Sequence, residues 1–215
     1  VQSRTGMNDI FVTYFVVLSF YRLYIFLTEY PRKSVKNLAL LGLSTGLAAA
    51  TKWTGFYVVG IAFLWVIVNV LKKRNWKLVP LGVFYLALLP VAVYILSYGQ
   101  WWYQGHSLKQ FYELHQQIWW YQTGLKATHG YQSQAYTWPF LVRPVWFYVK
   151  YQDVIEPNGV KQLYIGNIYT MGHPLIWWAG LGGMAYVLYR LVIVKKTDRL
   201  GLAVLIVGYF GMFLP

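Results

Sequence analysis

Long apolar segments recur along this chain, and they restrict its fold more than any other feature. Several of them approach the roughly 20 residues that a helix needs to cross a bilayer. Of the 215 residues, 58% are hydrophobic and only 12% are charged, whereas an ordinary soluble domain carries about 25% charged residues. We therefore expect an all-α polytopic membrane protein, because a helix satisfies its own backbone hydrogen bonds in lipid.

Basic residues indicate which ends of these segments face the cytoplasm. The net charge of +13 would also suit a nucleic-acid-binding protein, but such proteins concentrate their cations on one face. Here the cations cluster in short gaps between apolar segments, which is the positive-inside pattern of cytoplasmic loops. We therefore expect no nucleic-acid partner. The cations in these gaps are Arg32, Lys33, Lys36, Lys72, Lys73, Arg74, Lys77, Lys195, Lys196 and Arg199.

The gaps and the apolar segments together predict six crossings. Residues 37–71 lie between two cytoplasmic gaps and are too many for one crossing, so we expect a turn at residues 51–55 on the outer side. The first of these two crossings would be short, about 14 residues, and therefore tilted or ending below the membrane surface. We expect about four crossings in residues 1–96, an extracytoplasmic loop at 97–172 and further transmembrane helices at 173–215.

Both ends of the chain look like cuts in a longer protein. The chain starts at Val1 and stops inside an apolar run. We therefore expect the helices of residues 1–96 to belong to a larger N-terminal bundle, and the last helix to be truncated.

The expected outer loop is rich in aromatic residues and contains a signal for the start of a helix. Ser107 and Gln110 have the spacing of a capping box. From Leu108 onwards, apolar and aromatic residues recur at helical spacing, for example Phe111 and His115. We expect an interfacial helix here, whose aromatic face either lies in lipid or forms a wall over a catalytic cleft.

Lys52 is the cation whose position most strongly indicates chemistry. It lies in the expected outer turn, where it either snorkels to the interface or binds a lipid phosphate as a point charge. Arg143 could hold phosphate bidentately. Asp9 follows Arg4 at the outer end of the first crossing, where it is either simply solvated or orients Arg4 toward an anion. We predict that Lys52, Arg4 and Arg143 bind a lipid phosphate and that Asp9 has an orienting role.

Metal and cofactor sites are not expected. The chain has no cysteine, and its histidines show neither the close helical spacing of a metal pair nor a convincing carboxylate partner. Phosphate-binding and dinucleotide-binding glycine patterns are also missing from the sequence. The histidines are His106, His115, His129 and His173.

Four stretches resemble the protein O-mannosyltransferase family. Residues 3–11 resemble its Ser-Arg-x-x-Met-x-Asp segment, residues 42–57 its segment ending in Lys-Trp-x-Gly, and residues 165–178 its Gly-Asn-Pro-x-x-Trp-Trp entry to a late helix. Residues 118–148 resemble the family's extracytoplasmic loop through Trp120, Tyr121, His129, Tyr131, Ser133, Trp138, Pro139, Arg143, Pro144 and Trp146. The chain departs from the family pattern at Gln122, Gly130 and His173.

This resemblance implies a glycosyltransferase of the C-type transmembrane fold, with no cofactor. Such enzymes move mannose from a polyprenyl-phosphate carrier to Ser or Thr hydroxyls of exported proteins. The resemblance also implies that Lys52 contacts the carrier phosphate and that the catalytic acidic pair precedes Val1. The aromatic loop would shape the donor pocket, for which the candidate residues are Trp53, His129, Tyr131, Ser133, Trp138 and Trp146.

Other functions stay open at this point. A different C-type transferase could move aminoarabinose or another sugar onto lipid or glycan. A transporter subunit would instead place charges at mid-membrane and carry inverted repeats, and a non-catalytic membrane scaffold is a third class. We expect the chain in a bacterial cytoplasmic membrane with its active site facing outward, and the endoplasmic reticulum is the alternative.

Overall fold

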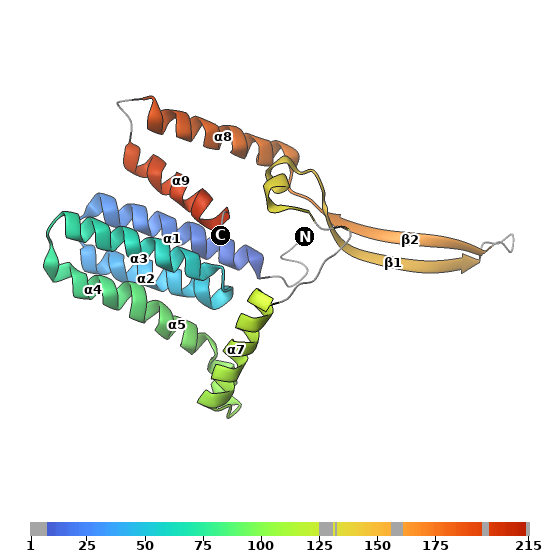
Figure 1. The fold of residues 1–215 in the computed structure, drawn as a ribbon, viewed down its shortest axis with the longest axis horizontal. Helices are drawn as coiled ribbons and strands as arrows, with labels where there is room; N and C mark the ends of the chain where they lie inside the picture. The colour runs from blue at the N-terminus through green and yellow to red at the C-terminus, as the bar shows by residue number, and fades with distance from the viewer. Residues whose placement is uncertain (1–7, 125–130, 132, 156–160, 195–197, 214–215) are drawn as a thin grey trace. The chain divides into compact units, whose positions relative to one another are not determined.

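The computed structural model describes residues 8–124, 131, 133–155, 161–194 and 198–213 (Figure 1). Its elements are α1 (Asp9–Glu29), α2 (Ser34–Thr51), α3 (Gly55–Lys72), the 3-10 turn η2 (Trp76–Leu78), α4 (Val79–Val83), the π-helical segment η3 (Phe84–Leu88), α5 (Leu89–Ser97), α6 (Gly99–Tyr103), α7 (Leu108–Gly124), the 3-10 helix η4 (Ala135–Phe140), β1 (Val145–Ile155), β2 (Lys161–Thr170), α8 (Pro174–Val192) and α9 (Arg199–Phe213).

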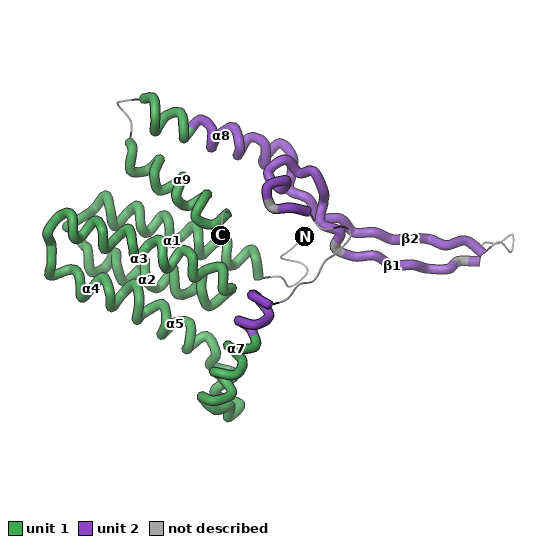
Figure 2. Tube along the Cα trace, in the orientation of Figure 1, with its two compact units in different colours: residues 1–117, 187–215 green, residues 118–186 purple. Residues whose placement is uncertain are grey.

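The chain divides into two compact units, which are coloured separately in Figure 2. Residues 1–117 and 187–215 form the first unit, and residues 118–186 form the second. We call the first the helical unit and the second the hairpin unit. The expected division at residues 96 and 172 followed hydropathy, and it stays a prediction about the membrane-spanning parts.

Four helices of the described residues are long and apolar enough to cross a membrane. They are α1, α3, the continuous run Trp76–Ser97 and α8, while α9 is apolar but shorter. This confirms the predicted polytopic helical membrane protein. The run Trp76–Ser97 stays helical through Pro90, which cannot donate a backbone hydrogen bond. The turn before it, η3, widens to π-helical geometry, and this accommodates the proline.

α2 packs centrally in the helical unit, against α1, α3 and α5. It is 18 residues long and starts at Ser34, before the apolar stretch that begins at residue 37. It is not among the four candidate spans, and the short crossing of about 14 residues stays a prediction. Small residues let its neighbours approach closely. A Cβ on Gly42, for example, would collide with the carbonyl oxygen of Tyr85.

The core of the helical unit lies between α1, α2, α3 and the run Trp76–Ser97, and α9 packs against α1 and α3. Its buried side chains are mostly aliphatic, so close packing stabilises it. The core residues are Phe20, Leu23, Phe26, Leu27, Leu38, Leu41, Ala48, Val58, Ala62, Val66, Val70, Leu78, Leu86 and Val204.

The helices of this unit alternate in direction, so their connections gather at two ends. At one end, which we call the basic end, the turns after α1 and α3 contain Arg32, Lys33 and Arg74. At the other, which we call the Lys52 end, α1 begins at Asp9 and Lys52 joins α2 to α3. The predicted turn at residues 51–55 is therefore confirmed, since α2 ends at Thr51 and α3 starts at Gly55.

The capping box predicted at the start of the interfacial helix is present in α7. The backbone N–H of Ser107 donates to Gln110 Oε1 at 2.7 Å, and the backbone N–H of Gln110 donates to Ser107 Oγ at 3.3 Å. These reciprocal bonds satisfy donors that the first turn of a helix leaves unpaired. Short-range spacing alone thus located the start of this helix.

The hairpin unit contains an antiparallel pair of strands that the sequence analysis did not predict. β1 pairs with β2 in a register that runs from Val145↔Thr170 to Ile155↔Lys161, with an irregularity between Trp146 and Tyr148. Both strands are rich in tyrosine and β-branched residues, which favour extended backbone. An ion pair of 2.9 Å between Lys161 Nζ and Asp153 Oδ2 lies near the tip.

Candidate functional site

An ion pair joins Asp9 and Lys52 at the Lys52 end. Lys52 Nζ lies 2.6 Å from Asp9 Oδ1. Asp9 is in the first turn of α1, where a carboxylate interacts favourably with the helix dipole. The side-chain amide of Asn8 donates to the carbonyl of Thr51 at 2.7 Å, which ties the start of α1 to the end of α2. The antiparallel packing of these two helices therefore sets the position of the ion pair.

Lys52 keeps the ability to bind another anion while it is paired with Asp9. Its side chain is 43% exposed and that of Asp9 is 26% exposed, and ion pairs of such exposure contribute only about 0–1 kcal/mol to stability. The ammonium has three N–H donors, and Asp9 accepts from one of them. The pair therefore orients the ammonium more than it holds the helices together.

The turn that carries Lys52 is tight because α3 starts against the backbone of α2. The N–H of Gly55 donates to the carbonyl of Lys52 at 2.8 Å. A Cβ at position 55 would collide with the carbonyl of Ala48, so only glycine allows this approach. Gly55 thereby keeps the short turn that contains Lys52 and Trp53 close against the end of α2.

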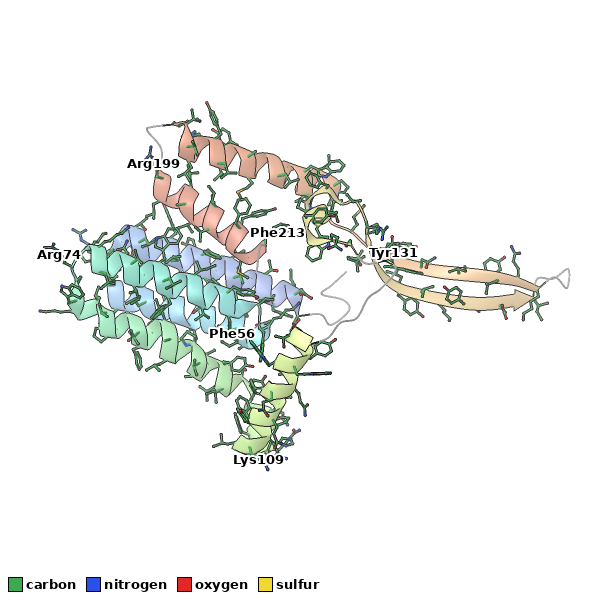
Figure 3. All side chains as sticks on the ribbon, viewed as in Figure 1. Phe56, Arg74, Lys109, Tyr131, Arg199 and Phe213 are labelled. Atoms are coloured by element: carbon green, nitrogen blue, oxygen red, sulfur yellow. The ribbon has the colours of Figure 1, made fainter. Side chains whose placement is uncertain are left out.

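Trp53 belongs to a hydrogen-bonded aromatic cluster beside Lys52. Its indole N–H donates to the hydroxyl of Tyr94 at 2.8 Å. The same hydroxyl lies 2.8 Å from His115 Nε2 and 3.1 Å from the hydroxyl of Tyr98. The Trp53 and His115 rings also stack, with centroids 6.0 Å apart. Residues from the turn before α3, from α5 and from α7 therefore meet at one phenolic oxygen. Phe56, which is labelled in Figure 3, lies in the first turn of α3, and the centre of its ring is 5.3 Å from that of Tyr94.

The carbonyl oxygen of Phe111 determines the direction of these hydrogen bonds. His115 Nδ1 lies 2.7 Å from the carbonyl oxygen of Phe111, which can only accept, so Nδ1 carries a proton. In the neutral imidazole, Nε2 is then an acceptor. Tyr94 consequently donates to His115 while it accepts from Trp53. The cluster thus connects Trp53 to α7 through a fully paired path.

In the hairpin unit, three predicted site residues lie together. The Arg143 guanidinium carbon is 5.3 Å from the centre of the Tyr131 ring, and the rings of Tyr131 and Trp146 meet edge to face at 5.6 Å. Trp146 also donates its indole N–H to Asn167 Oδ1 at 2.9 Å, which attaches it to β2. Arg143 therefore lies against Tyr131, which in turn packs on Trp146.

Ser133 and Trp138 form a second contact in this unit. The Trp138 indole N–H donates to Ser133 Oγ at 2.9 Å, and the pair encloses the first turn of η4. The hydroxyl of Ser133 is therefore oriented by Trp138. The remaining predicted residues, Arg4 and His129, lie outside the described residues.

Metal binding finds no support in the described ranges. Within residues 8–124, 131, 133–155, 161–194 and 198–213, no group of three or more histidine, aspartate or glutamate side chains is close enough to hold a metal ion.

Comparison with protein families gives two matches that together extend along nearly the whole chain. The model described as dolichyl-phosphate-mannose-protein mannosyltransferase matches residues 1–100, and the one for the C-terminal four TMM region of protein-O-mannosyltransferase matches residues 107–209. The chain belongs to the protein O-mannosyltransferase family. The family resemblance noted from the sequence motifs is thereby confirmed.

Curated relatives of this chain are named as protein mannosyltransferases. Polyprenol-phosphate-mannose--protein mannosyltransferases of Mycolicibacterium smegmatis and Mycobacterium tuberculosis are each 26% identical over 100% of the chain, which spans 52% and 51% of their lengths. Dolichyl-phosphate-mannose--protein mannosyltransferase 1 of Saccharomyces cerevisiae is 31% identical over 34% of the chain and 7% of its own length. The chain thus spans about half the length of its bacterial relatives. No solved structure matches significantly.

In this family member, the sequence analysis found part of the site and missed the rest. It named Asp9 and Lys52 separately and did not foresee that they pair. Its prediction that Asp9 orients Arg4 concerns a residue outside the described part of the chain. It missed Tyr94 and Tyr98 because nothing in the local sequence separates them from other apolar residues of a spanning helix. His115 had been noted only as part of a helical face, and its spacing gave no sign of Tyr94.

Proposed function

We propose that this chain is part of a membrane-bound glycosyltransferase that moves mannose from a polyprenyl-phosphate-mannose donor to Ser or Thr hydroxyls of exported proteins. The observation that carries this proposal is the oriented ammonium of Lys52, which is partly exposed beside an aromatic cluster. The names of the curated relatives support the same donor and a protein acceptor. We propose further that the catalytic base lies in the part of the whole enzyme that precedes Val1.

Lys52 would act on the leaving group. Transfer of the mannosyl residue breaks its bond to the phosphate oxygen, which leaves the carrier phosphate with an additional negative charge. A cation that is already oriented stabilises this charge as it develops. Asp9 would keep the ammonium in place, and Trp53 would border the donor, because indole faces suit a sugar ring. We propose that Arg4 and Arg143 add to the phosphate site, and that His129, Tyr131, Ser133, Trp138 and Trp146 shape the donor pocket.

The location follows from the same proposal. We place the Lys52 end at the outer surface of a bacterial cytoplasmic membrane, because the loops at the opposite end carry the excess of lysine and arginine. A donor with a lipid tail would then present its phosphate at the depth of Lys52. The acceptor polypeptide would approach from the aqueous side after export.

Replacement of Lys52 by alanine in the full-length enzyme tests the proposal. Transfer of mannose from polyprenyl-phosphate mannose to a Ser/Thr-containing peptide should fall about 100-fold or more, as is typical when one preorganised electrostatic contact is lost. Lys72→Ala is the matched control, since it removes an exposed lysine from the basic end and should leave turnover within about twofold. Unchanged turnover in Lys52→Ala would remove this lysine from the mechanism. A preference for a different donor sugar would refute the proposed substrate.

A further inference from the structure

A groove at the basic end has the properties of an anion site that the proposed transfer reaction does not use. It has a volume of about 400 Å³ and lies between the turn after α1, the first turn of α2 and the turn before α4. Three lysines contribute to its lining: Lys33, Lys36 and Lys77. The other lining residues are Pro31, Ser34, Val35, Asn75, Leu78 and Leu81.

The start of α2 adds positive potential to this groove. Lys33 precedes the helix with a left-handed backbone, and no side chain caps the first turn. The first intrahelical bond is from the N–H of Asn37 to the carbonyl of Lys33, so the N–H groups before it have no acceptor in the helix. The helix dipole is positive at this end, which normally favours acidic residues. Lysines here are locally unfavourable, and such conflicts often mark functional sites.

Carboxylates do not neutralise the groove in the described part of the chain. The lysines that form ion pairs there are Lys52, Lys109 and Lys161. Glu29, which ends α1, lies near the first turn of α2, where it accepts a hydrogen bond from the Asn37 side chain at 3.0 Å. It forms no ion pair with the three groove lysines, so it offsets their charge only in part. Three lysines against one carboxylate leave the groove with an excess of positive charge for an external anion.

The surroundings of the groove fit a lipid better than a free ion. Pro31, Val35, Leu78 and Leu81 give it an apolar wall next to its lysines, as required by a ligand with a charged head and an acyl chain. Trp76, which is adjacent in sequence to the lining residues, is 65% exposed. Exposed tryptophans are typical of the headgroup level of a bilayer, so the lysines lie at the depth of lipid phosphates.

We infer that this groove binds the phosphate of an anionic membrane phospholipid, with Lys33, Lys36 and Lys77 as its ligands. The lysines would donate charge-assisted hydrogen bonds to the phosphate oxygens, and the free N–H groups at the start of α2 would supply further donors. The apolar wall would contact the first part of an acyl chain. Basic pockets between transmembrane helices on the cytoplasmic side are suited to such headgroups.

Lipid binding to the purified full-length enzyme in detergent tests this inference. Native mass spectrometry would follow titration with dioleoylphosphatidylglycerol, and with dioleoylphosphatidylcholine as the zwitterionic comparison. The groove variant is Lys33→Gln/Lys36→Gln/Lys77→Gln. The control variant, Arg32→Gln/Lys72→Gln/Arg74→Gln, removes the same charge from the same end without touching the groove lining.

The groove variant should lose at least about tenfold more phosphatidylglycerol affinity than the control variant, because directed charge-assisted bonds are lost only in the groove. Equal losses in both variants would show diffuse attraction to the basic end and overturn the inference. Phosphatidylcholine binding as tight as that of phosphatidylglycerol would also overturn it. Competition by inorganic phosphate at equal affinity would identify a free phosphate site instead of a lipid site.

A conservative variant separates binding from folding. Lys33→Arg/Lys36→Arg/Lys77→Arg keeps the charge and the donors, so it should retain phosphatidylglycerol affinity within about threefold. The thermal unfolding midpoint of each variant checks that the helical unit is intact. Loss of lipid affinity in the arginine variant at an unchanged midpoint would contradict the proposed role of these three side chains.

Discussion

The two ends of the helical unit differ in how they use charge. At the basic end, lysines and arginines crowd the turns, and α2 starts among them without a cap. At the Lys52 end, one lysine is paired with one aspartate at 2.6 Å, beside a cluster whose hydrogen bonds meet at the Tyr94 hydroxyl. In Figure 3, Arg74 and Phe56 mark these two ends. The number of charges and the precision of their placement are therefore separate properties: several cations share the basic end, whereas one cation is held by a carboxylate at the Lys52 end.

Accessibility labelling tests whether the two ends lie on opposite sides of the membrane, and it should give the largest effect. The chain contains no cysteine, so Lys72→Cys and Lys109→Cys variants, in a full-length enzyme freed of other cysteines, each place one thiol within it. Lys109 belongs to the α7 segment of the helical unit, and its side chain is 84% exposed. A membrane-impermeant maleimide added to intact cells should label position 109 and leave position 72 unlabelled, because the positive-inside rule places them on opposite sides. Labelling of both from outside would refute the proposed orientation.

Tyr94→Phe tests whether precise placement at the Lys52 end depends on the hydroxyl that Trp53 and His115 share. The change leaves the Trp53 indole N–H without its acceptor and His115 Nε2 without its donor, which should destabilise the protein by about 1–3 kcal/mol. Trp53 adjoins Lys52, so mannosyl transfer should also fall, by roughly tenfold, because small displacements of positioning residues are expensive in rate. Unfolding midpoints and turnover would be measured together.

The matched control for this change is Tyr103→Phe, which removes a hydroxyl from a residue that is 87% exposed. It should alter the unfolding free energy by no more than about 0.5 kcal/mol. If both tyrosine variants behave alike, the cluster around Tyr94 contributes nothing particular to the Lys52 end. A purely structural role would lower the midpoint of Tyr94→Phe without changing its turnover.

Asp9→Asn should give the smallest effect. The amide keeps the shape of the side chain but loses the charge that orients Lys52, and a partly exposed pair contributes up to about 1 kcal/mol. We expect a drop in turnover of about two- to fivefold. The comparison is Asp198→Asn at the other end, where the carboxylate accepts hydrogen bonds from the Tyr24 hydroxyl and the Gly201 N–H, each at 3.2 Å. That variant should leave turnover unchanged, and a larger effect there than at Asp9 would contradict the proposed site.

Local sequence patterns predicted much of the helical architecture, because their causes are local. The turn between α2 and α3 and the start of α7 at its capping box both follow from apolar periodicity and caps. α2 begins at Ser34, before the apolar stretch that starts at residue 37. Ser34 and Asn37 are buried there, whereas Val35 and Lys36 are exposed, and hydropathy alone does not show which polar residues pack against neighbouring helices.

The hairpin unit shows where such patterns fail. Tyrosines and tryptophans that suit an interface also suit a strand. The Asn158-Gly159 dipeptide between the two aromatic stretches is a hairpin turn signal, and the sequence analysis passed over it. Pairing with β2 settles the matter, because a strand completes its backbone hydrogen bonds only with a partner. The aromatic motifs of this segment carried the family resemblance, yet they did not reveal its secondary structure.

By itself, the sequence determined that the chain crosses a membrane as helices, which ends of those helices are basic, and to which family it belongs. Hydrophobicity, charge and short motifs act within a few residues of where they stand, so they can be read in order. Only the tertiary structure decided that Asp9 pairs with Lys52 and that Trp53 and His115 share the hydroxyl of Tyr94. These contacts join residues about 20 to 40 positions apart, and only the packing of the helices brings them within reach.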